Sequence, residues 1–260
     1  MPERIQIHQE QGVLTVTLNR PDKRNAIDSV MVSELKDALA DDARHEDVRV
    51  VVLTGGGSVF SAGADLAAMK ELRDASLMEN RDDSAHLAGL FEAIYTHEKP
   101  VIGKVNGHAI AGGCGLAAVC DLSFVAKGSK LGFTETRIGF VPAIVMVYVR
   151  RKLGEAALRD LLLRGRLIEA HDAATMGLVN EVVSPDNLDD VVADVAEEIA
   201  TETSRSGVAL TKEMLAQVPG MGRAEALDYA IQMNAFARGT DDCKAGIQAF
   251  LDKEPPPWKK

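Results

Sequence analysis

The chain has 260 residues, of which 46% are hydrophobic and 26% charged, and 29 basic against 39 acidic side chains give a net charge of −10. This composition suits one large folded core or two modest ones and excludes a disordered chain. It also disfavours nucleic acid as a partner, because neutralising phosphates over a long stretch requires clustered lysine and arginine.

Neither a membrane segment nor a metal site is expected. The longest apolar run, residues 138–149, is interrupted by Pro142 and is shorter than the roughly 20 residues that span a bilayer, so it predicts a buried segment. The N-terminal MPERIQIHQE is charged where a signal peptide needs an apolar stretch, which favours a cytoplasmic protein. The three cysteines lack CxxC spacing and the six histidines are scattered, which indicates neither a disulfide framework nor metal ligands.

The first 55 residues predict a hairpin, a helix and a buried strand. RIQIHQ and residues 12–19 alternate apolar and polar residues around a Gln-Gly turn, as in two strands with one buried face. Asp28 or Ser29 can cap a helix that continues at helical spacing to Ala43. The β-branched run over residues 48–55 predicts a strand that is covered on both faces.

A strand, a glycine-rich loop and a helix then follow one another twice. Residues 48–55 lead into GGSVFSAGADLAAMK, and the short strand predicted over residues 101–105 leads into NGHAIAGG and CGLAAVCD. Residues 74–98, between the two units, are polar and then amphipathic, so we expect a mobile segment followed by a helix. The recurrence predicts a spiral of similar turns.

The remainder of the chain predicts one more strand and then helices. LSFVA has strand character, and two helical segments end at Gly165 and Gly177. Beyond Pro185 the pattern is almost entirely helical. We therefore predict an α/β core over residues 1–200 and a helical assembly region over residues 201–260.

The two glycine-rich loops present bare backbone amides at predicted helix N-termini, where negative charge is stabilised. They are SAGAD, residues 61–65, and AGGCG, residues 111–115. Tight packing of a helix on a sheet would also require glycine. Two loops of the same design favour a pair of amide donors for one oxyanion.

A dinucleotide fingerprint is a weaker interpretation of the second loop. Gly113, Gly115 and Ala118 fit GxGxxA, and Glu135 lies twenty residues past Gly115. However, the predicted strand ends at Val105, well before Gly113, and the next strand is not followed by an acid that could bind a ribose. The context therefore disfavours a dinucleotide site.

Five sequence blocks, in this order, resemble the crotonase superfamily of enoyl-CoA hydratases and isomerases over nearly the whole chain. They are NRPDKRNAID, FSAGADL, VNGHAIAGGCGLAAVCDLSF, LGFTETRIGFVPA and ATMGLVNEVV. The resemblance implies an α/β fold, a crotonase-like spiral of ββα turns with a helical C-terminal region. It implies an acyl-CoA thioester as substrate, with coenzyme A as part of that substrate and no other cofactor. It further implies homo-oligomers, either trimers or dimers of trimers.

The resemblance also assigns roles to individual residues. The amides of Ala64 and Gly112 would bind the thioester oxygen, and Glu135 would move a proton on the substrate. Arg20, Lys23 and Arg24 would form a positive cluster near the CoA phosphates. CoA would lie beside Arg24, Asn25, Ala26, Ala62, Asp65 and Leu66.

Position 115 departs from the pattern of the two-carboxylate hydratases, which have a second glutamate where this chain has Gly115. Two carboxylates naturally share the addition of water across a double bond, whereas one can shuttle a proton between carbons. We expect a hydratase that acts through an enolate stabilised by the oxyanion hole. An isomerase that uses Glu135 alone and a non-catalytic acyl-CoA-binding subunit remain open alternatives.

A second departure follows Glu135, where residues 143–146 are bulkier than the glycine cluster of many members and predict a reshaped apolar acyl pocket. With Gly115 and Glu135, this run resembles bacterial enoyl-CoA hydratases, some similar to methylglutaconyl-CoA hydratases. Among other candidate groups, Asp121 is expected to be structural and Cys114 a buried filler. His108, close to the AGGCG loop, is a candidate for a supporting group that does not itself touch the substrate.

Overall fold

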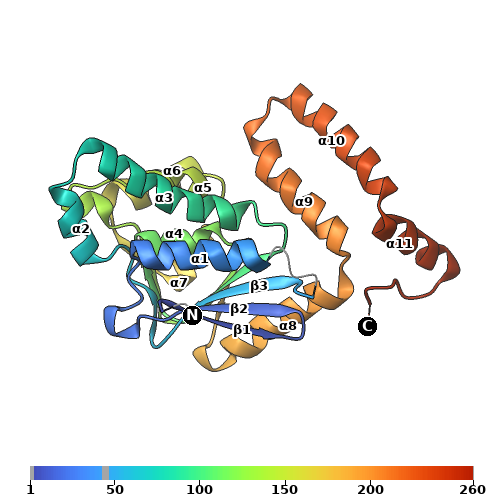
Figure 1. The fold of residues 1–260 in the computed structure, drawn as a ribbon, viewed down its shortest axis with the longest axis horizontal. Coiled ribbons are helices and arrows are strands. Elements are labelled where there is room, and N and C mark those ends of the chain that lie inside the picture. Colours follow the sequence, from blue (N-terminus) through green and yellow to red (C-terminus); the bar gives the residue numbers. More distant parts are fainter. Residues whose placement is uncertain (1–2, 43–46, 260) are drawn as a thin grey trace.

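In the computed structural model, which describes residues 3–42 and 47–259, the chain winds through two β-sheets and ends in helices (Figure 1). The larger sheet has the order β1-β2-β3-β5-β7-β10, and every neighbouring pair is parallel except the β1–β2 hairpin. Its strands are β1 (Ile5–Glu10), β2 (Val13–Leu18), β3 (Val50–Gly55), β5 (Val101–Val105), β7 (Leu122–Ala126) and β10 (Glu181–Val183). The predicted α/β class, hairpin and three long strands are confirmed.

The central strand β3 is buried on both faces, as its unbroken β-branched sequence predicts. Val51 and Leu53 belong to the core cluster beneath the first helices, whereas Val50 and Val52 pack with the apolar residues of a later helix, α8 (Leu188–Glu202). Because successive side chains of a strand point to opposite faces, this one strand contributes to two separate apolar layers.

The smaller sheet consists of four three-residue strands in the order β4-β6-β8-β9. The pairs β4–β6 and β6–β8 are parallel, and β8–β9 is antiparallel. Three successive turns of the chain, β3–β4, β5–β6 and β7–β8, each place one strand in the larger sheet and then one in the smaller sheet, which confirms the predicted spiral. The strands are β4 (Val59–Ser61), β6 (His108–Ile110), β8 (Lys130–Gly132) and β9 (Leu167–Glu169).

Helices connect the turns of this spiral and cover the larger sheet, with α1 and α3 on one face and α8 on the other (Figure 1). The 3-10 helices η1 (Pro21–Lys23), η2 (Glu135–Ile138), η3 (Pro185–Asn187) and η4 (Val218–Gly220) are short. The α-helices are α1 (Ser29–Asp42), α2 (Leu66–Arg73), α3 (Leu77–Tyr95), α4 (Gly112–Val119), α5 (Ala143–Val149), α6 (Glu155–Arg164), α7 (Ala170–Thr175), α8 (Leu188–Glu202), α9 (Arg205–Gln217), α10 (Arg223–Gly239) and α11 (Asp241–Asp252).

Local signals account for several helix ends. Asp28 caps α1, because its carboxylate accepts the Met31 amide at 2.8 Å, while the predicted end at Ala43 lies outside the described residues. The helix predicted within residues 74–98 is confirmed, but it starts earlier than expected, because α3 already begins at Leu77. Ser76 and Glu79 form a reciprocal capping box there, a signal that the polar composition concealed.

The apolar run over residues 138–149 is only partly buried, contrary to expectation. Val145, Tyr148 and Val149 face the core from α5, whereas Phe140 and Met146 are exposed. The run folds as a 3-10 turn, a proline and a short helix, so its side chains point in several directions. Within the described residues, no helix is long and apolar enough to cross a membrane.

Three C-terminal helices, α9 to α11, lead away from the sheets (Figure 1). Lys212 anchors the first of them: its ammonium is 2.6 Å from Asp121 Oδ2 and also donates to the carbonyl of Lys99. Asp121 additionally accepts the Val101 amide, which confirms its structural role. The helices carry several exposed apolar side chains, namely Leu215, Leu227, Ile231, Phe236, Ile247, Phe250 and Leu251.

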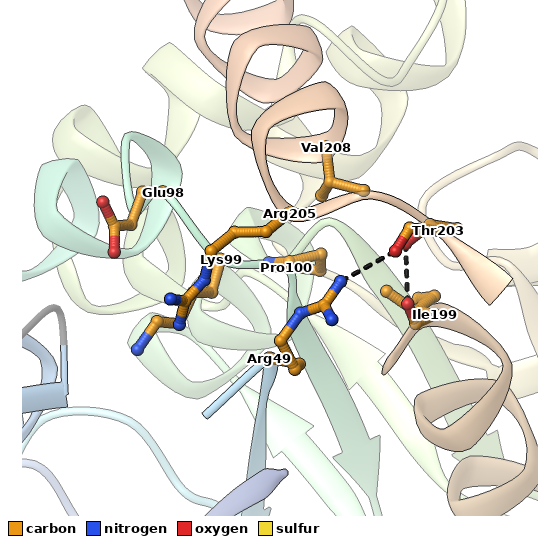
Figure 2. A pocket seen from close by; sticks show the side chains of 8 residues that line it. All are labelled: Arg49, Glu98, Lys99, Pro100, Ile199, Thr203, Arg205 and Val208. Atoms are coloured by element: carbon orange, nitrogen blue, oxygen red, sulfur yellow. Dashed lines mark hydrogen bonds between the residues drawn. The ribbon is translucent and has the colours of Figure 1, made fainter. Parts of the chain in front are cut away.

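Polar contacts also hold the junction between α8 and α9 against the larger sheet (Figure 2). Arg49 donates to the carbonyl of Thr203 at 2.8 Å, and Arg205 donates to the carbonyl of Val48 at 2.9 Å. A small pocket there is lined by none of the residues that the sequence nominates for catalysis or CoA binding. The junction therefore belongs to the scaffold.

Candidate active site

The smaller sheet brings the sequence-predicted site residues to one edge. Ser61 of β4 is in register with Ala109 of β6, which is in register with Leu131 of β8. Ala64, Gly112 and Glu135 follow these three positions after three, three and four residues respectively. Since the strands are parallel, all three chains leave the sheet at its carboxyl edge, the side on which open α/β sheets bind ligands.

The two glycine-rich loops touch main chain to main chain. A Cβ on Gly63, which has φ +85°, would lie 2.8 Å from the Ile110 oxygen and 3.2 Å from the Gly112 nitrogen. A Cβ on Gly113 would lie 2.5 Å from the Ser61 oxygen. Side chains at these glycines would force the loops apart, so tight packing and a shared site are two consequences of one arrangement.

The backbone around Ala64 is oriented by a parallel bridge to Ile27. The Ile27 amide donates to the Gly63 carbonyl at 2.7 Å, and the Asp65 amide donates to the Ile27 carbonyl at 2.9 Å. Successive amides of an extended chain point to opposite sides, so the Ala64 N–H points away from Ile27. Ala64 is exposed, which leaves this amide accessible to a ligand.

The Gly112 amide is the first of helix α4, and the first N–H groups of a helix have no partner within it. The chain reaches this position through Ala111, whose φ of 51° is uncommon for a residue with a side chain. The Ala111 amide donates to the Gly132 carbonyl at 2.7 Å, which fixes the turn to the end of β8. The helix therefore begins beside Ala64 and directs positive partial charge toward the same edge.

Glu135 begins the 3-10 helix η2 and is held by contacts of its neighbours. The Thr136 hydroxyl donates to the Leu162 carbonyl at 3.2 Å, and the Phe140 amide donates to the Glu135 carbonyl at 3.0 Å. Within the described residues, the Glu135 Oε2 atom is buried without a hydrogen-bond partner. Burial raises the pKa of this carboxyl group, as is frequent for residues that transfer protons.

Glu135 also lies close enough to α4 to affect Cys114 electrostatically. Burial, and to a smaller extent the charge of Glu135, raise the pKa of the Cys114 thiol. Cys114 is fully buried, which confirms it as a filler. His108, considered as a supporting group, is exposed, and its Nδ1 accepts the Lys130 amide at 3.0 Å.

The space beside Gly115 is occupied by apolar side chains. A Cβ on Gly115 would overlap Val145 Cγ1 and would lie 2.9 Å from Phe91 Cε1. Val145 and Phe91 are buried, so neither can withdraw into solvent. The two departures from the family pattern, glycine at residue 115 and the bulky segment over residues 143–146, are therefore linked, because Val145 fills the space that a side chain at residue 115 would need.

Aromatic contacts fix this apolar filling. The Tyr148 hydroxyl donates to Glu92 at 3.0 Å and so links α5 to α3. The rings of Phe91 and Tyr148 stack with centroids 5.8 Å apart. The sequence alone does not indicate that Phe91, Glu92 and Tyr148 are related to position 115, because this relation depends on the packing of two distant helices.

The segments expected to contact CoA lie side by side. The Ala62 amide donates to the Arg24 carbonyl at 2.9 Å, and the Ser61 hydroxyl donates to the Asn25 carbonyl at 2.8 Å. Asn25 is fully buried: its side chain bonds to the carbonyls of Gly56 and Val59, and its amide donates to the Arg20 carbonyl, so it supports this segment from within. Ala26 is buried beside it, and the side chain of Leu66 lies outside the described residues.

Arg20 does not lie in an open phosphate-binding cluster with Lys23 and Arg24, as the resemblance implies, but is paired with two carboxylates. Its guanidinium pairs with Asp28 at 3.0 Å and Asp65 at 2.8 Å, whereas Lys23 and Arg24 are exposed. Burial alone would raise the pKa of Asp65, but hydrogen bonds from the Ala67 amide and from Arg20 lower it overall. The positive charge open to a ligand here comes from Lys23 and Arg24.

Comparison with known proteins agrees with this architecture. The family described as Enoyl-CoA hydratase/isomerase matches residues 8–260. A putative enoyl-CoA hydratase of Thermus thermophilus is 45% identical, with 95% of this chain and 98% of that protein covered. The crystal structure of Pseudomonas aeruginosa AtuE matches with a TM-score of 0.94 at 30% identity, covering 99% of this chain and 100% of that one.

A Mycobacterium smegmatis enoyl-CoA hydratase structure matches with a TM-score of 0.92 at 32% identity, covering 98% of this chain and 99% of that one. The fold is thus that of the crotonases. The chain belongs to the enoyl-CoA hydratase/isomerase family.

We expect Gly115→Ala to destabilise the protein, because the new methyl group would overlap Val145 and Phe91. Overpacking costs about 1–3 kcal/mol and outweighs the roughly 1 kcal/mol that alanine gains over glycine in a helix. Gly115→Glu should be worse and should not increase hydration. Urea unfolding of Gly115→Ala, Val145→Ala and the double variant measures the coupling energy between residues 115 and 145. If the changes in the free energy of unfolding simply add, the predicted contact is contradicted.

Proposed function

We propose that the protein is an enoyl-CoA hydratase, which adds water across the 2,3 double bond of an enoyl-CoA thioester. The observation that carries this proposal is the meeting of two outward backbone amides, those of Ala64 and Gly112, with the half-buried Glu135, whose Oε2 atom is buried, at one sheet edge. The names of the relatives support the same reaction.

The two amides would bind the thioester carbonyl oxygen. As water attacks C3, negative charge moves onto this oxygen, and preorganised N–H donors stabilise that charge without rearranging. The close contact of the two loops at Gly63 keeps the donors together. The enolate is therefore the species that this geometry favours most.

Glu135 would act as both base and acid in this reaction. Its carboxylate accepts a proton from the attacking water and then returns a proton to C2 of the enolate, so one carboxyl group completes the addition. Phe91 and Val145 occupy the place beside residue 115, which leaves no room for a second carboxylate there. The same single group could instead move a proton between C2 and C4 of a 3-enoyl thioester, and this makes isomerisation the second candidate reaction.

The CoA portion of the substrate would lie along residues 24–26 and 62–66. Lys23 and Arg24 supply exposed positive charge, and Ala62 and Asp65 belong to the loop that carries the Ala64 amide. The apolar acyl group would then face the segment over residues 143–146, in which Met146 is exposed. The negative net charge of the chain does not oppose this arrangement, because recognition rests on local groups.

The protein should hydrate crotonyl-CoA, seen as loss of the absorbance of the conjugated thioester. A 3-enoyl-CoA offered in parallel should show no gain of conjugation if the protein is a hydratase alone. Glu135→Gln should lose most turnover, about 100-fold or more, since it can neither accept nor donate the proton. A variant that kept full activity would refute the role of Glu135.

Glu135→Gln also has a built-in folding control. Because burial raises the folded-state pKa of Glu135, its ionised form costs stability at pH 7, and this cost disappears as the pH falls through that pKa. The amide should therefore not lower the melting temperature at pH 7. Loss of turnover in the variant can then be assigned to chemistry.

The pH dependence of hydration should report the same group. Water activation needs the carboxylate, so kcat/KM should fall as the pH drops through the pKa of Glu135. Because burial raises that pKa, the midpoint of this fall should lie above about 4.3, the value for an exposed glutamate. Rates measured on protein that remains folded at each pH provide the test, and a midpoint at or below that value would contradict the buried assignment.

We further propose that the chain assembles into trimers or dimers of trimers through residues 201–260. The exposed apolar side chains of α10 and α11, including Ile231, Phe236 and Phe250, would become buried on assembly. Light scattering should give a mass that is a multiple of three chains. Ile231→Glu should reduce this mass, whereas Ile7→Glu on strand β1 should not, and a monomeric parent protein would reject the proposal.

A further inference from the structure

Arg20 connects the starts of two helices that are distant in sequence. Asp28 caps α1 by accepting the Met31 amide, and Asp65 caps α2 by accepting the Ala67 amide, each at 2.8 Å. The Arg20 guanidinium lies between them, with Nη1 3.0 Å from Asp28 and Nη2 2.8 Å from Asp65. Only 12% of the Arg20 side chain is exposed, so solvent screens these pairs weakly.

The same guanidinium also holds the strand that orients Ala64. Nη1 donates to the Ala26 carbonyl at 2.7 Å, next to Ile27. Ile27 makes the two main-chain hydrogen bonds that flank Ala64 and turn its amide outward. Arg20 therefore restrains both sides of the Ala64 amide, through Ala26 on one segment and Asp65 on the other.

We propose that Arg20 is a positioning residue, which acts through Asp65 and the Ala26–Ile27 segment to hold the Ala64 amide in line with the Gly112 amide. This inference rests on the proposed function, because it assumes that these amides bind a thioester oxygen. A donor displaced by about 1 Å stabilises the developing charge poorly, and misplacement of that size costs up to about 100-fold in rate.

The geometry requires arginine in particular. Three acceptors, on Asp28, Asp65 and Ala26, lie around one planar group, and a guanidinium presents two nitrogens to them at once. A lysine ammonium is a single point that cannot span these positions. Arg20→Lys thus keeps the charge while removing the bridge.

Optical spectroscopy of a bound conjugated thioester can test this role apart from turnover. Two hydrogen bonds to the carbonyl oxygen polarise the conjugated system of cinnamoyl-CoA, so binding should shift its absorbance to longer wavelength. Glu135→Gln serves as the parent in these spectra, because it should bind without turnover. Arg20→Lys and Asp65→Asn are added to it, with Asp28→Asn as the matched control.

Asp65→Asn and Asp28→Asn each remove one charged partner of Arg20, and in both variants the asparagine oxygen can still accept the capping amide of its helix. Only Asp65 is adjacent to Ala64, so Asp28→Asn is the matched control. We expect Arg20→Lys and Asp65→Asn to lose most of the red shift and, with Glu135 intact, to lower kcat about 10- to 100-fold with a smaller change in KM. Asp28→Asn should keep the shift.

Each outcome decides between these assignments. If Arg20→Lys and Asp65→Asn show the same red shift as the parent, the positioning role is overturned. It is also overturned if all three variants lose the red shift equally, because this would indicate a general loosening of the structure around Arg20. Thermal melting confirms that the compared variants are folded. If the parent binds cinnamoyl-CoA without any shift, the proposed amide pair is rejected, and this inference with it. The proposed hydratase activity is tested separately, by hydration of crotonyl-CoA by the unmodified chain.

Discussion

Contact between two main chains, where the loop around Gly63 meets the loop around Gly112, is the constraint on which the candidate site depends. The short parallel strands β4, β6 and β8 deliver those loops in register, and the bridge to Ile27 turns Ala64 outward. Without side chains in the contact, both amides can serve one atom of a ligand. The larger sheet and its helices supply the buried support that keeps this contact in place.

The packing around Gly115 is equally tight. Phe91 and Val145 close the region next to Gly115, and the Tyr148–Glu92 hydrogen bond fastens the helices that carry them. Near this packing, in the part of the chain that the structure describes, Glu135 Oε2 is buried without a hydrogen-bond partner, and burial raises the pKa of the group. The protein thereby accepts a stability cost at the group that we propose transfers the proton.

Much of this could be predicted from sequence where the signal is local. The hairpin, strand β3, the Asp28 cap and the two glycine-rich loops each leave a period or a residue type that can be recognised. The second sheet could not be found, because strands of three residues are too short to show alternation. Likewise the sequence places Arg20 near the CoA phosphates, whereas the structure pairs it with Asp28 and Asp65. These two carboxylates come close to Arg20 only in the folded chain.

The packing at residue 115 has a consequence for how such chains can diverge. A second carboxylate would need room that Val145 and Phe91 now occupy, and those side chains lie on two other helices. Replacing the glycine first overpacks the core, while shrinking either neighbour first leaves a cavity. A chain with the second acid would thus need matching changes at residues 91, 115 and 145, because each change made alone destabilises the fold.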